Sequence, residues 1–366
     1  MADMIFSGVT ISGGISITAP PPTSSKAIFG YGNPGGTNVS ITNLVSNTGV
    51  VGNDVAGVGT ARRLLAATGY GTDKAIFGYG TAGGIDLSMT NKVSNTGVVS
   101  NDTTGVGTGR YGVAAAVYGS SGQAIFGYGG TNGGAFFSLT NLVSNTGVVA
   151  TDTTGVGTAR LYPAAAGYGT DKAIFGYGQL AGPSYASTAI TNLVSNTGVV
   201  ATNTTGVGTA RCYLAAAGYG TDKAIFGFGV DATSYSLTNL VSNAGVVATD
   251  TTGVGTARSV LAAAGYGTDK AIFGYGNSGG TNLSITNKVS NTGVVATDTT
   301  GVGTARNQLA AAGYGTGTAI FGYGNDNSGH DYSMTNLVSN TGVVATDTTG
   351  VGTARSALAA ASYGLS

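Results

Sequence analysis

The stretch L-A-A-A-G-Y-G-T-D-K-A-I-F-G-Y, residues 261–275, holds the pattern that decides the fold. A small-residue segment, Leu261–Tyr266, is followed by residues 267–269 (Gly-Thr-Asp) and then by an aliphatic and aromatic segment, Lys270–Tyr275. Gly and Asp tolerate the positive φ of tight hairpin turns, and Ile, Phe and Tyr favour strands. The stretch therefore predicts two antiparallel strands joined by a short turn.

This hairpin is one of seven near-identical copies. The string A-I-F-G begins at Ala27, Ala75, Ala124, Ala173, Ala224, Ala271 and Ala319, at intervals of about 48 residues. A fixed period of 20–50 residues is the signature of a repeat architecture. In the copy quoted above, two more strands are expected at Leu283–Val289 and Val294–Asp298, separated by the turn Ser-Asn-Thr-Gly at 290–293. Four short strands per repeat are typical of one blade of a β-propeller.

The ends of the chain favour a closed ring over an open solenoid. The first repeat begins at its second strand, near Lys26, and the last repeat stops after its first strand, Leu358–Tyr363. One blade would then combine the C-terminal strand with three N-terminal strands, which closes the ring and hides the sheet edges. A solenoid would instead need polar caps. We therefore expect an all-β chain with a seven-bladed propeller over residues 26–366.

Residues 1–25 precede the repeats and form a second predicted domain. Val9–Ser12 and Ile15–Thr18 flank Gly13-Gly14, which predicts a β-hairpin, and Pro20–Pro22 follow as a stiff linker. A lone hairpin is marginally stable in water, so this one should dock on its own propeller or on a neighbouring copy. The candidate assembly residues are Val9, Ile11, Ile15 and Ile17.

The repeat resembles a kelch repeat. The stretches that carry the resemblance are T-A-R, L-A-A-A-G, K-A-I-F-G-Y-G and S-N-T-G-V-V, over residues 26–364. The sequence departs from the kelch pattern in two places: the glycine pair is split, as in Gly78-Tyr79-Gly80, and Val stands at the position of the kelch Trp. The near-identical copies and the opening V-T-I-S-G-G-I-S-I-T also resemble predicted structural proteins of bacteriophages. These resemblances imply a propeller, and a place in a virion fibre.

The copies differ mainly in two windows, one directly after each repeated Arg and one between the second and third strands. Strand alternation puts both windows on one face of the ring, and loops on a rigid scaffold are where recognition usually occurs. Unconstrained drift of these loops is the alternative reading. The candidate ligand-face residues are Arg63, Tyr111, Phe136, Phe137, Tyr162, Tyr185, Tyr213, Tyr235, Gln308, His330 and Tyr332.

One Arg recurs at the end of G-V-G-T-[AG]-R in every copy. Each follows an Asp by about eight residues, as Arg160 follows Asp152, although one copy has Asn203 instead. Sevenfold repetition indicates a structural role, as an ion pair between blades or as a guanidinium that binds carbonyl groups. These residues are Arg62, Arg110, Arg160, Arg211, Arg258, Arg306 and Arg355.

Composition argues against an enzyme or a nucleic-acid-binding protein. The formal net charge is zero, charged residues make up 8% of the chain, and no basic cluster occurs. A single His and a single Cys offer no triad and no zinc cluster. Residues 325–331 carry oxygen ligands but lack EF-hand spacing, so a polar turn is favoured over a calcium site. No catalytic residue, metal or cofactor is therefore expected.

Neither a signal peptide nor a membrane span is visible in the sequence. The leading hypothesis is a non-enzymatic structural and binding protein of a phage virion fibre or an extracellular filament. It would self-associate through residues 1–25 and could recognise a glycan or a cell-surface receptor. A monomeric lectin-like or kelch-like interaction module is the alternative. A carbohydrate-active enzyme is a weaker third reading.

Overall fold

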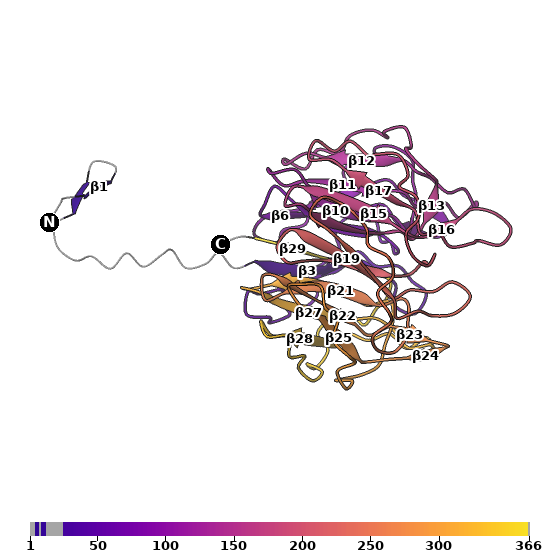
Figure 1. Cartoon of the computed structure of the whole chain (residues 1–366). Helices are drawn as coiled ribbons and strands as arrows, with labels where there is room; N and C mark the ends of the chain where they lie inside the picture. Colours follow the sequence, from indigo (N-terminus) through magenta and orange to yellow (C-terminus); the bar gives the residue numbers. More distant parts are fainter. Residues whose placement is uncertain (1–3, 7–8, 12–24, 365–366) are drawn as a thin grey trace.

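The computed structural model describes residues 4–6, 9–11 and 25–364, and the chain is all-β with many small antiparallel sheets (Figure 1). Within residues 25–364, seven sheets have three strands each. In the order of their pairing they are β5–β6–β9 (Ala66–Tyr70, Lys74–Gly78, Thr90–Val93), β10–β11–β12 (Ala114–Tyr118, Gln123–Gly127, Thr140–Val143), β14–β15–β17 (Ala164–Tyr168, Lys172–Gly176, Thr191–Val194), β18–β19–β20 (Ala215–Tyr219, Lys223–Gly227, Thr238–Val241), β21–β22–β25 (Ala262–Tyr266, Lys270–Gly274, Thr286–Val289), β26–β27–β28 (Ala310–Tyr314, Thr318–Gly322, Thr335–Val338) and β29–β3–β4 (Ala359–Tyr363, Lys26–Gly30, Thr42–Val45).

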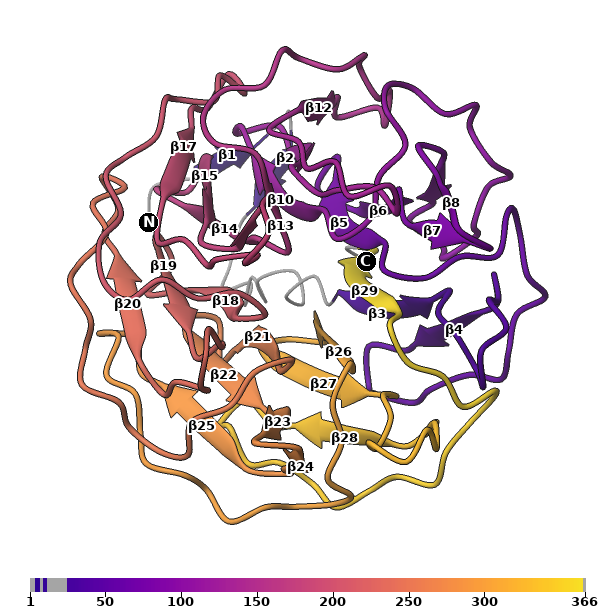
Figure 2. The same cartoon turned by 90° about the vertical axis from the view of Figure 1, so that its right-hand side faces the viewer.

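The first strands of the seven sheets contact one another around a common axis. Each packs against the first strand of the next sheet, in the closed order β5, β10, β14, β18, β21, β26, β29 and back to β5. Figure 2 shows the sheets radiating from this axis. The seventh sheet joins both ends of the chain, because β29 pairs antiparallel with β3 in the register Ala361↔Ile28. The expected pairing of the chain ends is therefore present.

The second strand of each sheet is buried on both faces. In β6, Ala75, Ile76 and Phe77 are fully buried. Successive side chains of a strand point to opposite faces. Ile76 accordingly packs in a cluster with Phe126 of the following sheet, while Ala75 and Phe77 pack with Ile28 of the preceding one. A Cβ on Gly78 would lie 2.8 Å from the Phe126 ring, so glycine here lets the neighbouring sheet approach.

The turns between first and second strands link neighbouring sheets through the backbone. The first glycine of each turn donates its N–H to a carbonyl in the corresponding turn of the next sheet. Seven such bonds run in a complete circle through six turns and the two chain ends at Ser25 and Gly364: Gly71 to Gly122, Gly119 to Asp171, Gly169 to Asp222, Gly220 to Asp269, Gly267 to Gly317, Gly315 to Ser25 and Gly364 to Asp73. We call the surface around these turns the constant mouth.

The expected fourth strand is not a continuous strand. Beside β4, Val45 bridges Val51 and Thr42 bridges Val55, so three residues on the outer segment face two on β4. This extra residue is a β-bulge. The side-chain amide of Asn43 fills the interruption, donating to the Gly52 carbonyl at 3.1 Å and to Asp54 Oδ1 at 3.0 Å. The same pattern of bridges recurs in the other sheets, so each has three strands and a bridged outer segment.

Four two-stranded sheets complete the described structure. Three lie within the repeats: β7–β8 (Thr81–Ala82, Ile85–Asp86), β13–β16 (Arg160–Leu161, Gln179–Leu180) and β23–β24 (Asn277–Ser278, Thr281–Asn282). The fourth pairs β1 (Met4–Phe6) with β2 (Val9–Ile11). The predicted partner of Val9–Ile11 was Ile15–Thr18, which lies outside the described residues. The described hairpin instead uses the segment before Val9, which the sequence pattern did not indicate.

Candidate functional site: the variable mouth

The two variable windows meet in every repeat. The residue directly after each repeated Arg bridges the first residue of the loop between the second and third strands, as in Arg63↔Thr81, Tyr111↔Gly130 and Cys212↔Val230. In the third repeat this contact extends into the pair β13–β16. In Figure 1, β16, β23 and β24 lie on one face of the ring, and the start of β3 and the end of β29 lie on the opposite face. The residues that differ between copies therefore gather on one face.

The second residue after each repeated Arg lies around the axis on this face. All seven have φ between 50° and 61°, and only one of them is glycine: Leu64, Gly112, Tyr162, Tyr213, Val260, Gln308 and Ala357. We call this set the variable mouth. Left-handed backbone is unfavourable for residues with a Cβ, and most of all for a β-branched residue such as Val260. Strain of this kind persists only where the surrounding structure imposes it.

Backbone hydrogen bonds hold the variable mouth in place. Leu64 N–H donates to the Ala357 carbonyl at 3.0 Å, Gly112 N–H to Leu64 at 3.1 Å, and Tyr162 N–H to Gly112 at 3.1 Å. The same link runs from Val260 to Tyr213, from Gln308 to Val260 and from Ala357 to Gln308. Because these backbone groups are occupied by each other, a ligand here would meet mainly side chains.

A cavity of about 580 Å³ opens at the variable mouth. The seven mouth residues line it together with Leu65, Val113, Pro163, Leu261 and other apolar side chains. Arg63 is the charged residue of the lining. Concave, mostly apolar cavities with a few polar groups are typical of ligand sites.

Three of the predicted aromatic residues form a cluster on one side of this cavity. The ring centroids of Tyr162 and Tyr213 are 4.5 Å apart, and those of Tyr111 and Tyr162 are 6.1 Å apart. Burial, together with the neighbouring Tyr213 and Tyr111, raises the pKa of Tyr162 above its usual range, so its hydroxyl stays protonated at neutral pH. Gln308, the other predicted mouth residue, lies in a different part of the ring, between Val260 and Ala357.

The remaining predicted aromatic residues do not join this cluster. Phe136 and Tyr185 pair across adjacent loops at 6.0 Å, and Tyr185 is half-exposed. His330 and Tyr332 pair within one loop at 4.8 Å. Phe137 and Tyr235 are partly buried where their loops return to the sheet. The sequence could place these residues on one face, but it could not separate those at the mouth from those on the loops.

Several polar residues of the loops bind the neighbouring loop. Asn132 donates from its side chain to Asp86 at 2.6 Å, Gly35 N–H donates to Asp331 at 2.8 Å, and Ser187 N–H donates to Asp231 at 3.4 Å. These contacts use residues that differ between the copies. Part of the variation therefore specifies how adjacent loops fit together, which leaves the mouth as the better candidate for recognition.

The repeated Arg residues are fully buried behind this face. Arg62 donates from Nε to the Tyr79 carbonyl at 2.8 Å and from Nη2 to Asn91 Oδ1 at 2.7 Å. Its guanidinium also lies 4.1 Å from the ring centre of Tyr31, in the preceding sheet. The hydrogen bonds to Tyr79 and Asn91 lie within one sheet, whereas the contact with the Tyr31 aromatic ring joins two sheets. All seven arginines stack on an aromatic ring in this way.

The expected acidic partner of these arginines needs correction. Asp152, eight residues before Arg160, lies instead 3.5 Å from Nη1 of Arg110, which belongs to the same sheet as Asp152. The pair is therefore within a sheet rather than between sheets. Asp152 lies in the outer segment of this sheet, between the bridged residues Val149 and Thr153, and Arg110 precedes the first strand of the same sheet. Burial alone would raise the pKa of Asp152, but hydrogen bonds from Thr108 and Asn141 and the charge of Arg110 outweigh it and lower that pKa.

One copy of this network is incomplete. Asn203 occupies the position of the Asp that would face Arg160. In this copy Nε and Nη2 of Arg160 and Oδ1 of Asn192 are buried without a hydrogen-bond partner among the described residues. A buried guanidinium normally has its donors satisfied. The copy that has Asn203 in place of Asp is therefore the one in which the hydrogen-bond network around the Arg is weakened.

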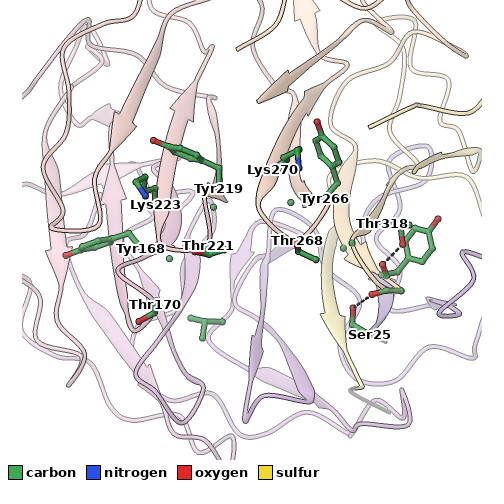
Figure 3. A pocket seen from close by; sticks show the side chains of 18 of the residues that line it. Ser25, Tyr168, Thr170, Tyr219, Thr221, Lys223, Tyr266, Thr268, Lys270 and Thr318 are labelled. Atoms are coloured by element: carbon green, nitrogen blue, oxygen red, sulfur yellow. Dashed lines mark hydrogen bonds between the residues drawn. The ribbon is translucent and has the colours of Figure 1, made fainter. Parts of the chain in front are cut away.

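The constant mouth has a different chemistry, which the sequence analysis did not single out. Thr72, Thr170, Thr221 and Thr268 occupy turn tips at φ of 66° to 68°. Lysines follow them, and each is paired with the adjacent Asp, as Lys223 with Asp222 at 2.6 Å and Lys270 with Asp269 at 2.7 Å. Thr221, Lys223, Thr268 and Lys270 line a cavity of about 480 Å³, and Figure 3 shows them around it. A second cavity of about 590 Å³ is lined by Thr72, Lys74 and Thr170 among others. The repeated string G-T-D-K was the available signal.

The described residues give no sign of a metal centre. No group of three His, Cys, Asp or Glu side chains in residues 4–6, 9–11 and 25–364 could hold a metal ion. In the loop at 325–331, Asp326 Oδ1 accepts the N–H groups of Ser328 and His330, as in a polar turn. No helix in the described part of the chain has the length and hydropathy of a membrane span.

The assembly candidates fall largely outside this description. Val9 and Ile11 are in β2, whereas Ile15 and Ile17 lie outside the described residues. No family model matches the chain, and no curated protein sequence is significantly similar to it. The residues themselves therefore carry the functional interpretation.

Proposed function

We propose that residues 26–366 form a seven-bladed β-propeller that serves as a non-enzymatic binding and structural protein. The variable mouth is its recognition site. The observation that carries this proposal is the distribution of sequence differences: the copies share their strands, turns and buried arginines, but differ at the residues that line one cavity on the axis. A scaffold repeated seven times can distinguish an asymmetric ligand only through positions that break its symmetry.

The proposal of a non-enzymatic protein is supported by the use of its charged groups. Arg62 and its counterparts bind carbonyl groups, Asn side chains and aromatic rings inside the sheets. The aspartates beside them accept hydrogen bonds from Thr and Asn side chains, as Asp102 does from Thr60 and Asn91. These groups recur as structural units, whereas catalysis needs one asymmetric constellation of groups.

We place the protein in a larger extracellular or virion-associated assembly, such as a phage fibre or a filament. Low charge, the resemblance to predicted phage structural proteins and the N-terminal extension support this placement. A two-stranded hairpin such as β1–β2 is marginally stable alone, which favours docking on another surface.

A glycan-binding module is the second candidate, favoured by the cluster of Tyr111, Tyr162 and Tyr213, of which Tyr162 and Tyr213 line an almost uncharged cavity. A glycan array tests it with the full chain. The double substitution Tyr162→Asn and Tyr213→Asn removes both rings, and Asn tolerates the positive φ at these positions. The double substitution Thr221→Asn and Thr268→Asn is the matched control, since it introduces Asn at positive φ on the constant mouth.

Glycan binding that is lost in the double variant and kept in the control would support recognition at the variable mouth. Binding that survives the double variant would place the glycan elsewhere and contradict the site. An array with no bound glycan would remove the lectin-like candidate, and a peptide-display library screened against the same variants would then test recognition at the mouth directly.

A further inference from the structure

The N-terminal extension leaves the ring beside the axis, at the constant mouth. Ser25 lines both cavities there, its carbonyl accepts a hydrogen bond from Gly315 N–H at 2.6 Å, and its hydroxyl donates to the Gly315 carbonyl at 3.4 Å (Figure 3). The variable mouth opens on the other face. In each copy Ser25, to which the extension is joined, therefore lies at one end of the axis, and the cavity of the variable mouth lies at the other.

The extension and the variable mouth have matching chemistry. Residues 1–24 contain Met4, Ile5, Phe6, Val9, Ile11, Ile15 and Ile17 among small and polar residues, with Asp3 as the single charged side chain. Most of the residues that line the mouth are apolar, although about half of the surface they present is polar, and Arg63 is the charged residue of the lining. A largely apolar segment with small polar residues and one carboxylate fits a mixed cavity with one guanidinium.

We propose that the variable mouth binds the N-terminal extension of a second copy, so that copies join head to tail along the axis. This inference rests on the proposed recognition function of the mouth and names its partner. A single peptide has no sevenfold symmetry, so the mouth that holds it must be asymmetric, as the sequence differences make it. Head-to-tail contacts that do not close into a ring generate filaments.

Complementation between two full-length variants tests the proposal. The mouth variant carries Leu64→Asp and Val260→Asp, which put charge into the cavity. Asp accepts the positive φ of both positions better than Leu or Val, so folding should be preserved. The extension variant carries Phe6→Asp and Ile11→Asp. Thr221→Asp with Thr268→Asp is the matched control, since it adds the same charge at positive φ on the constant mouth.

Sedimentation velocity over a range of concentrations gives the readout, and circular dichroism melting shows that each variant is folded. We expect the wild type and the constant-mouth control to form long oligomers, and each of the two interface variants alone to remain at 35.6 kDa. Mixed in equal amounts, the two variants should form a species of twice that mass and nothing larger. One intact extension then meets one intact mouth, and growth stops.

Three results would overturn the proposal. A wild type that remains monomeric at all concentrations would exclude head-to-tail assembly, including the case in which the extension docks on its own ring. Oligomers that persist in the mouth variant would place the interface elsewhere. Two variants that stay monomeric when mixed would show that the contact is not between extension and mouth. None of these results bears on glycan or peptide binding at the mouth, so recognition by the mouth is tested separately. A monomeric wild type would count against the filament and leave the recognition function in place.

Discussion

The incomplete copy at Arg160 predicts that one substitution, Asn203→Asp, stabilises the protein. In the intact copy at Arg110, Nε donates to the Tyr128 carbonyl at 2.7 Å and Nη1 lies 3.5 Å from Asp152 Oδ1. In the incomplete copy Nε and Nη2 of Arg160 lack a hydrogen-bond partner among the described residues. A carboxylate at position 203 would bring a negative charge to Nη1 of Arg160, as Asp152 does to Nη1 of Arg110. It would also accept the Thr158 hydroxyl, in addition to the Thr158 N–H that Asn203 already accepts.

The expected gain follows from the groups involved. A hydrogen bond to a charged group contributes about 1.5–3 kcal/mol. The corresponding Asp152 is 22% exposed, so solvent screening reduces the ionic part. We therefore expect Asn203→Asp to raise the free energy of unfolding by about 1–2 kcal/mol. For a chain of this length that corresponds to a rise of about 1–3 °C in the melting temperature.

The reciprocal substitution Asp152→Asn is the matched control, because it creates the incomplete arrangement at Arg110 and should cost about 1–3 kcal/mol. Urea denaturation at pH 7 followed by circular dichroism measures both changes. The gain from Asn203→Asp should vanish below about pH 3, where the new carboxylate is protonated. A loss in the control without a gain in Asn203→Asp would refute the reasoning, since the two sites would then not be equivalent.

Two further predictions concern acid stability and the packing between sheets. Burial would raise the pKa of Asp102 and of Asp298, but hydrogen bonds and the nearby Arg outweigh burial and lower both pKa values. The free energy of unfolding should therefore be constant from about pH 7 to 5 and fall as the pH drops below about 4. Acid titration of the folded protein would measure this fall. A fall that began near pH 6 would implicate other groups. Gly78→Ala puts a Cβ 2.8 Å from the Phe126 ring and should destabilise the fold by about 1–3 kcal/mol in urea. Gly133→Ala, where φ is not positive and the nearest atom to a Cβ is Thr131 Oγ1 at 3.8 Å, should cost less. Equal costs at the two glycines would contradict the packing described here.

Much of the fold follows from the repeated sequence. The string A-I-F-G predicted the second strand of each sheet, and its continuous apolar run fits a strand that is buried on both faces. The broken repeat at the two ends predicted the pairing of β29 with β3. The fourth strand was wrong because the Asn43 side chain, rather than the backbone, binds the outer segment there. Local residue propensities do not show that a side chain will replace a backbone hydrogen bond between strands.

The candidate site was harder to predict. The positions that vary were visible in the sequence, but their left-handed backbone was not, since Leu64 and Val260 are residues that local rules exclude from positive φ. The ion pair was misassigned because the nearest Asp in the sequence belongs to the preceding sheet, as Asp152 does relative to Arg160. The sequence of one repeat does not reveal contacts between segments that are about forty residues apart, such as that between Arg110 and Asp152.

The central claim is that both ends of the chain complete one sheet and thereby close the ring that holds the variable mouth. Amide hydrogen exchange of the full chain, read by mass spectrometry, tests this most directly. Peptides covering β29 and β3 should be protected as strongly as β21 and β22, because both pairs make the same ladder. Exchange of β29 and β3 as fast as that of a free chain end would show that the ring is open and would contradict the account.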